Sequence, residues 1–328
     1  MPLSIRFAAV LALGAAALGF SGSQALSQGK KPDVRIATGT PGGAYYAMGA
    51  VFADTLTRSG RVNTATAEAS SGAIESSRLM VSGEVTLGGM DANWVVAGLK
   101  GEAPYKEKIP LVTVVPLGVW GLFFIGLESS NIVSLDQIKG KRVAVGAKGS
   151  GMEAHARQIL TSIGLTIDDI RPVYQAFGPG ATSVREGKAD LQLQCCIPNP
   201  GLTELSELSK TRVVATPPQM LDKIIETSGV YAHGALKKGA IRGHDADLPV
   251  INILNGWMGV ASLPEETAYL IARTMIENIN AMAEKSPQYE TVKELFETAK
   301  TSGSKVLEMG APLHPGSLRA FKEAGILK

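Results

Sequence analysis

The chain has 328 residues, of which 45% are hydrophobic and 19% charged, and its formal net charge is +2. This composition is typical of a globular protein that is long enough for two α/β domains. A charge so close to neutral gives no electrostatic footprint for nucleic acid or for an acidic membrane surface, so neither partner is predicted.

The first 25 residues have the pattern of a secretory signal peptide. Arg6 gives a short positive region, residues 7–20 are apolar, and Ser23-Gln24-Ala25 is a small-x-small cleavage site. The apolar stretch is too short for a comfortable membrane span, although an uncleaved anchor is the alternative. The sequence therefore predicts cleavage near Ala25 and a mature protein in the periplasm.

Strand and helix signals then alternate along the chain. Strands are predicted at residues 34–38, 62–67, 85–89, 111–115, 121–127, 142–145, 171–177, 191–195 and 212–215. Helices are predicted at residues 45–58, 73–82, 92–99 and 152–163. This rhythm predicts an α/β protein whose sheets are mostly parallel and covered by helices.

One segment, residues 109–127, is nearly uncharged and about as long as a bilayer span. Pro116 and Gly118 interrupt it, and β-branched residues are frequent, so two buried strands explain it better than a membrane helix.

The last third is more helical, with apolar residues at helical spacing in 265–285 and 288–301. We expect these helices to pack on a sheet rather than to form a stripe for a partner. The Gly-interrupted apolar strands at 121–127 and 250–263 are predicted to cross between two lobes. Lobe 1 would comprise residues 32–122 and 260–328, and lobe 2 residues 123–259, with the crossings as a hinge.

The glycine-rich loop of residues 38–46 lies between the first strand and its helix. Glycine permits positive φ and close approach of a ligand to the backbone, and free N–H groups at a helix start attract an anion. We therefore predict that Thr40, Gly42, Gly43 and Tyr45 bind a ligand. The dinucleotide pattern GxGxxG is absent, and a plain tight turn is the alternative.

A second loop, residues 146–152, nearly matches a phosphate-binding P-loop. Met152 stands where the motif needs Lys, and Glu153 where it needs Ser or Thr, so nucleotide binding is excluded. The loop still precedes a helix start, which is suited to binding a carboxylate. We therefore select Gly149, Ser150, Gly151 and Met152 as candidate ligand-binding residues.

Other candidates lie where the carboxyl ends of the predicted strands meet, the edge at which open α/β sheets bind ligands. They are Ser71, Gly72, Asp91, Pro198 and Asn199, and Trp120 is a further candidate as an aromatic residue that could line the cleft. Asp91 is favoured as a helix N-cap, and buried aromatic residues such as Trp120 belong more often to a core.

Cys195 and Cys196 are adjacent and are the only cysteines of the sequence. A disulfide between neighbours departs from ordinary bridge geometry, so two buried, unbonded side chains are favoured.

The four histidines are scattered, and no Cys/His spacing matches a zinc site. The sequence contains no GxSxG, no HExxH and no recognisable Cys/His pairing. We therefore predict no metal, no cofactor and no catalytic activity.

Several motifs together resemble the TAXI solute-binding proteins, the receptor subunits of one class of tripartite ATP-independent periplasmic (TRAP) transporters. The matching segments are residues 36–46, 68–73, 82–84, 135–143, 149–151 and 312–316, in order over nearly the whole mature chain. The resemblance implies a two-lobed, type II-like periplasmic binding fold with the ligand in the interlobe cleft. It also implies a membrane complex driven by an ion gradient, and relatives associated with glutamate-like amino acids and dicarboxylates.

The chain departs from the family pattern at several positions near the presumed site. Thr40-Pro41 replaces the usual Gly-Thr, Glu75 stands where Asn is common, and Ala44 and Met152 replace frequent Thr. Each change alters the polarity near the presumed pocket, so the ligand of the relatives is not transferred.

The resulting prediction is a periplasmic receptor that captures a small metabolite bearing a carboxylate, of amino acid or dicarboxylate type. It would deliver this solute to the integral membrane subunits of a TRAP transporter. The alternatives are a periplasmic enzyme or a ligand-sensing protein on the same scaffold, since a fold alone does not determine function.

Overall fold

A mixed sheet forms the frame of the protein. The computed structural model describes residues 30–328, and within it Lys31–Lys328 forms one compact unit. The signal peptide predicted for residues 1–25 lies outside the described residues.

The strands are β1 (Asp33–Ala37), β2 (Thr64–Glu68), β3 (Leu87–Asp91), β4 (Leu111–Leu127), β5 (Arg142–Gly146), β6 (Arg171–Tyr174), β7 (Leu191–Cys195), β8 (Thr211–Val214), β9 (Ala232–Leu236) and β10 (Leu248–Val260). They form a ten-stranded sheet in the order β2-β1-β3-β10-β4-β7-β5-β6, with β8 paired to β4 and β9 to β10. β1 pairs in parallel with β2 and β3, and β5 with β6 and β7, as the alternation of strands and helices predicts.

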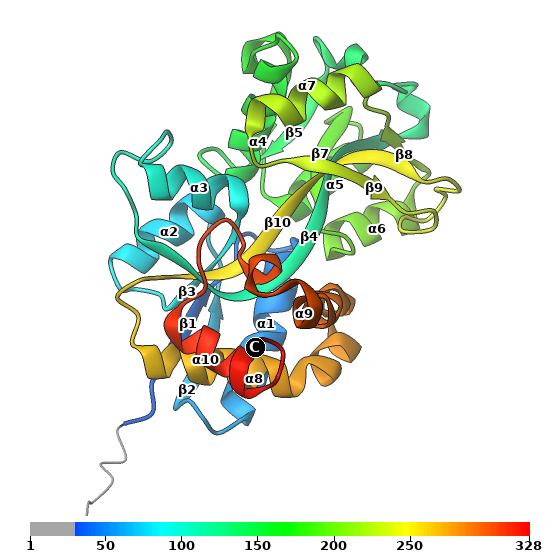
Figure 1. The fold of residues 1–328 in the computed structure, drawn as a ribbon. Coiled ribbons are helices and arrows are strands. Elements are labelled where there is room, and N and C mark those ends of the chain that lie inside the picture. Colours follow the sequence, from blue (N-terminus) through cyan, green and yellow to red (C-terminus); the bar gives the residue numbers. More distant parts are fainter. Residues whose placement is uncertain (1–29) are drawn as a thin grey trace, which may run out of the picture. The chain divides into compact units, whose positions relative to one another are not determined.

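The helices are α1 (Ala44–Arg58), α2 (Ala73–Val81), α3 (Ala92–Lys100), α4 (Gly151–Ser162), α5 (Phe177–Arg185), α6 (Pro200–Leu208), α7 (Pro218–Ser228), α8 (Glu265–Lys285), α9 (Glu290–Ser302) and α10 (Pro315–Glu323). In Figure 1, α1–α3 and α8–α10 gather around β1–β3, which we call the β1–β3 side. Helices α4–α7 gather around β5–β7, which we call the β5–β7 side.

Two long strands connect these sides (Figure 1). β4 and β10 pair antiparallel, from Leu111 opposite Val260 to Leu122 opposite Ile251. The end of β10 pairs with β3, whereas the end of β4 pairs with β7 and β8. The chain therefore passes between the sides in β4 and β10, which contain most of the segments 121–127 and 250–263 that the sequence analysis selected as crossings. The exact lobe boundaries stay a prediction.

Two expectations about strands are wrong. Residues 111–127 form the single strand β4 rather than two strands. Pairing with β10 continues past Pro116 and Gly118, because the register shifts there, opposite Gly256 and Asn255. The strand expected to reach residue 177 ends at Tyr174, and Phe177 instead opens α5, which the sequence analysis did not predict.

The core of the β1–β3 side centres on Trp257 of β10, which is fully buried. Its ring lies 6.4 Å from that of Phe52 and 5.7 Å from that of Tyr45, the latter at the edge of the pocket described below. Aromatic packing of this kind anchors α1 to the sheet and so positions the loop that precedes it.

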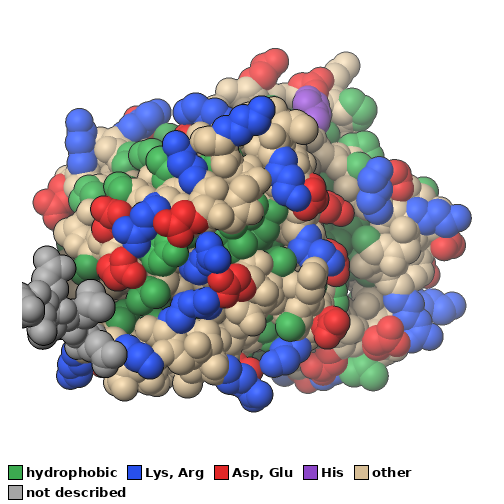
Figure 2. Space-filling model, turned by 60° about the horizontal axis from the view of Figure 1, so that its bottom comes forward, with side chains coloured by type: hydrophobic (Ala, Val, Ile, Leu, Met, Phe, Trp, Pro, Cys, Tyr) green, Lys and Arg blue, Asp and Glu red, His purple; other side chains and the backbone are tan. Residues whose placement is uncertain are grey.

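The surface carries charges of both signs, interspersed without a large patch of either on the face shown in Figure 2. Within residues 30–328, the helices include none with the length and apolar character needed to cross a bilayer.

Candidate functional site

A pocket lies between the β1–β3 side and the β5–β7 side, at the carboxyl ends of the parallel strands. It holds a cavity of about 80 Å³. Because one buried water needs roughly 10–15 Å³ measured in this way, the cavity suits a small metabolite.

The pocket brings together nine of the residues that the sequence analysis selected. They are Thr40, Gly43, Tyr45, Ser71, Gly72, Asp91, Ser150, Gly151 and Met152. These residues come from loops that are far apart in the sequence and belong to both sides of the sheet. The remaining lining is Thr38, Gly39, Ala44, Ala73, Gly89, Leu122, Gly146, Ala147, His155, Phe177, Cys195, Cys196, Ile253 and Asn255.

The first residues of three helices border the pocket. The N-caps of α1 and α2 are Gly43 and Gly72, and the N-cap of α4 is Ser150. All three line the pocket together with the residues that follow them. The N–H groups of a first helical turn have no partner within the helix, and they lie at the positive end of its dipole. The pocket can therefore offer backbone donors to an anion.

The loops before α2 and α4 come close to each other across the pocket. Gly72 has a φ of 121°, and a Cβ at this position would lie 3.5 Å from the backbone nitrogen of Gly151. Since L side chains rarely adopt this φ, glycine is needed here for the backbone to reach the other side.

A glutamate in the first turn of each helix folds back onto the preceding loop. Glu75 Oε2 accepts a hydrogen bond from the backbone N–H of Ser71 (2.5 Å), and Glu153 Oε2 accepts one from that of Gly149 (2.5 Å). The N–H of Ser71 is the main cause that lowers the pKa of Glu75. Both carboxylates bind N–H groups of their own loops and lie outside the pocket lining.

Asp91 and His155 join the two sides at the pocket wall. Asp91 Oδ1 accepts from the N–H of Asn93, so Asp91 is the N-cap of α3 that the sequence analysis favoured. Its Oδ2 lies 3.0 Å from His155 Nε2, and His155 Nδ1 contacts the hydroxyl of Tyr231. Trp94 Nε1 also lies 3.1 Å from Nε2, and the hydroxyl of Tyr231 also donates to Gln158 Oε1 (3.1 Å). Both ring nitrogens of His155 therefore have protein partners.

Tyr45 is held in place on the pocket wall. Its hydroxyl donates to Asn255 Oδ1 of β10 (2.7 Å), and the ring of Trp120 packs edge-on against it at 5.0 Å. Burial, with a smaller contribution from the charge of Asp91, raises the pKa of Tyr45 well above its usual value, so the hydroxyl stays protonated.

Five predicted site residues lie outside the pocket lining. Trp120 is buried behind Tyr45, and Gly149 donates to Glu153. Gly42 accepts a hydrogen bond from Gly201 through its carbonyl oxygen (3.1 Å), and the carbonyl of Pro198 accepts one from Gln288. Asn199 caps α6 by accepting from the N–H of Leu202 (2.9 Å). These residues support the pocket or join its two sides rather than line it.

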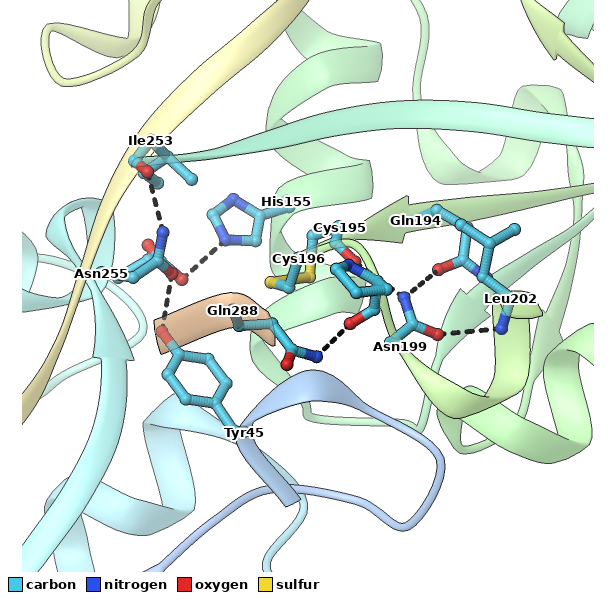
Figure 3. The surroundings of a disulfide bond; sticks show 12 residues. Tyr45, His155, Gln194, Cys195, Cys196, Asn199, Leu202, Ile253, Asn255 and Gln288 are labelled. Carbon is cyan, nitrogen blue, oxygen red and sulfur yellow. Dashed lines mark hydrogen bonds and ion pairs between the residues drawn. A yellow bond between two sulfur atoms is a disulfide. The ribbon is translucent and has the colours of Figure 1, made fainter. Parts of the chain in front are cut away.

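Cys195 and Cys196 form a disulfide at the end of β7, so the favoured interpretation of two unbonded side chains is wrong. Their predicted burial is confirmed. Consecutive side chains of a strand point to opposite faces, but Cys196 has a left-handed backbone (φ 62°), which breaks that alternation and lets the two sulfurs meet. Figure 3 shows the disulfide between Tyr45 and Asn255 on one side and Gln194 and Asn199 on the other.

Several pocket residues were missed in the sequence. His155 lies one turn after Gly151 in α4, a spacing that could have indicated it once the helix start was selected. Asn255 and Phe177 carry no local motif, because β10 and α5 reach the pocket only through the tertiary fold. Among residues 30–328 there is also no cluster of three side chains able to hold a metal ion.

The chain resembles known proteins in sequence and in fold. A sequence model described as the NMT1-like family matches residues 36–325. A solved protein from Bordetella bronchiseptica RB50 is 13% identical with a TM-score of 0.53, over 89% of each chain. A structure described as a periplasmic transporter is 12% identical with a TM-score of 0.53, over 85% of this chain and 99% of that one. The alkanesulfonate-binding protein SsuA from Xanthomonas axonopodis pv. citri, solved with MOPS, is 15% identical with a TM-score of 0.46, over 90% and 91%.

The double role of Asp91 gives a testable prediction. Asp91→Ala removes the cap of α3 and the partner of His155, so we expect the free energy of unfolding to fall by about 1–3 kcal/mol. Asp91→Asn keeps a capping oxygen and an amide that can donate to Nε2, so we expect a loss below about 1 kcal/mol. Urea unfolding followed by circular dichroism measures both, and equal losses would contradict the double role.

Proposed function

This chain belongs to the NMT1-like family and has the α/β fold of type II periplasmic binding proteins, and from that premise we propose that it is a periplasmic solute-binding receptor. The solute is a small metabolite that carries a carboxylate. In this proposal the receptor holds it between the two sides of the sheet and delivers it to a transporter in the membrane.

The observation that carries this proposal is the meeting of helix N-termini from both sides at one pocket. The starts of α1 and α2 come from the β1–β3 side and that of α4 from the β5–β7 side, and all three line the cavity. Backbone N–H groups at helix starts are established binders of carboxylates and phosphates. An anion held by both sides would stabilise the arrangement in which they contact each other.

The arrangement of His155 favours binding over catalysis. A general base must have a nitrogen free to take a proton from a bound substrate. In His155, Nε2 faces Asp91 and Nδ1 faces Tyr231, so neither nitrogen is available to a guest in this arrangement. This supports the proposal that the solute leaves the pocket unmodified.

A TRAP transporter is the proposed membrane partner. The support for this finer assignment is the sequence resemblance of residues 36–46, 68–73 and 149–151 to TAXI receptors. The signal peptide pattern of residues 1–25 supports the proposed location in the periplasm.

Export gives one prediction. When the full chain is expressed in a Gram-negative host, we expect the periplasmic fraction to contain a protein that begins at Leu26. N-terminal sequencing checks this, and recovery of an uncleaved chain in the membrane fraction would favour the anchor.

The transport partner gives a second prediction. In proteoliposomes with a TRAP membrane complex from the same genome, the receptor should promote solute uptake driven by an ion gradient without ATP. Uptake that needed ATP hydrolysis would contradict the TRAP assignment.

Ligand class gives a third prediction. A thermal-shift screen of amino acids, keto acids, monocarboxylates and dicarboxylates should find compounds that raise the melting temperature. A ligand at a hundred times its Kd stabilises the folded state by about 2.7 kcal/mol, which gives a shift of several degrees. Mass spectrometry should then recover the ligand unchanged, whereas turnover would favour an enzyme.

A matched pair of variants tests the site in the same screen. A Cβ at Gly151 would lie 3.0 Å from Trp94 Nε1, so Gly151→Leu fills the space where the two sides meet. We expect this variant to fold but to lose the ligand-induced shift. Lys148→Leu adds the same side chain at an exposed position of the same loop and should keep the shift. If the ligand raised the melting temperature of Gly151→Leu as much as that of the wild type, the start of α4 would not be part of the binding site.

A further inference from the structure

The pocket has helix starts that can bind one carboxylate and an otherwise apolar floor. We propose that it selects monocarboxylates with a compact apolar body over dicarboxylates. We assign the Cys195–Cys196 disulfide as part of the wall that this body contacts. The inference rests on the proposed function, which supplies the carboxylate site, and it names the solute class more narrowly.

The first argument is the charge of the lining. In the described part of the chain, the pocket lining includes no lysine and no arginine. Its only carboxylate, Asp91, already binds the N–H of Asn93 and faces His155. Once the first carboxylate occupies the helix starts, a second carboxylate on the solute would find no cationic side chain to pair with. Burying a charge without a partner is strongly unfavourable, so a solute with two carboxylates is disfavoured.

The second argument is the apolar floor of the pocket. Leu122 of β4 lies opposite Cys195 of β7 in the sheet, and Ile253 lies in β10, the neighbour of β4 on its other edge. All three line the pocket, so three adjacent strands contribute apolar side chains to it. Phe177 adds an aromatic ring beside the start of α1, where a Cβ at Gly43 would lie 3.8 Å from its Cγ. A hydrocarbon body, not a second charge, matches these residues.

The third argument is the chemistry of the bonded cysteines. Both line the pocket, and a disulfide has neither an S–H donor nor an ionisable thiol, so it presents an apolar surface. The turn that carries it is fixed from both sides. Asn199 Nδ2 donates to the carbonyl of Cys195 (3.0 Å), and Gln288 of the β1–β3 side donates to the carbonyl of Pro198 (Figure 3). The disulfide is therefore a wall of fixed position that can discriminate between solutes.

A matched pair of acids tests the selectivity in the wild-type protein. Butyrate and succinate have the same number of carbon atoms and differ by a terminal methyl group against a carboxylate. By isothermal titration calorimetry we expect butyrate to bind at least about tenfold more tightly than succinate. Propionate should bind about fourfold more weakly than butyrate, because it buries one methylene group fewer.

A disulfide variant tests the wall. Cys195→Ala/Cys196→Gly removes both sulfurs, and glycine keeps the left-handed backbone at position 196. We expect its affinity for butyrate to fall about tenfold, towards that for succinate, while Ile197→Ala, which changes the next residue outside the lining, binds as the wild type does. Circular dichroism checks folding. If the double variant does not fold, Ile253→Val trims one methyl group from the same floor and should weaken butyrate binding about fourfold without affecting succinate.

The outcomes separate this inference from the proposed function. Succinate binding as tightly as butyrate would overturn the selectivity and leave the carboxylate receptor intact. Unchanged butyrate affinity in the folded disulfide variant would overturn the role of the wall. If no carboxylate of either class binds, both the proposed function and the inference resting on it fail.

Discussion

β4 and β10 pair antiparallel from Leu111 opposite Val260 to Leu122 opposite Ile251, and every other strand attaches to this pair directly or through one or two intervening strands. The pairing determines how far the β1–β3 side lies from the β5–β7 side. It also brings Leu122 and Ile253 to the pocket floor and Asn255 within reach of Tyr45. The ladder shifts register twice, between Asn255 and Gly256 and between Trp257 and Met258, so its regular pairing is interrupted beside the pocket. The frame and the pocket thus depend on the same two strands.

In the proposed site, backbone N–H groups take the place that arginine or lysine has in many anion sites. Such a site needs loops that approach closely, and the glycines permit this. A Cβ at Gly42 would lie 2.8 Å from the backbone of Gly178 on the other side, and Gly72 has a positive φ facing Gly151. Donors fixed in helices lose little conformational entropy when a guest binds, whereas a long cationic side chain would lose rotamer freedom. A site of this kind discriminates by shape and by the number of charges that it can satisfy.

Much of the β1–β3 side could be predicted from the sequence, because its elements follow strong local signals. Helix α8 (Glu265–Lys285) begins after Pro264 and has the predicted bounds, and the glycine loop before α1 marks a site-forming turn. Helices α5, α6, α7 and α10 and strand β9 were missed. Gly178, Pro179 and Gly180 in α5 are signals of a loop, yet Thr40 and Pro41 of the other side accept hydrogen bonds from its first N–H groups. The Cys195–Cys196 disulfide depends on one backbone angle, and spacing does not reveal such an angle.

Outside the shared sheet, a limited set of polar contacts joins the two sides, and a bound solute would add to them. Besides the Asp91–His155 and Gln288–Pro198 contacts described above, three neutral hydrogen bonds join the sides. The backbone of Phe177 donates to Thr40 Oγ1 (3.3 Å), Gly201 donates to the carbonyl of Gly42 (3.1 Å), and Asn93 Nδ2 donates to Gln158 (2.9 Å). Each hydrogen bond contributes about 0.5–1.5 kcal/mol net, because water satisfies the same groups when the sides separate. Contacts of this strength favour the joined arrangement by only a few kcal/mol, which is the range in which a bound ligand shifts a conformational equilibrium. A guest that hydrogen bonds to the starts of both α1 and α4 would add to them directly, so recognition of the solute and closure of the pocket would be one event.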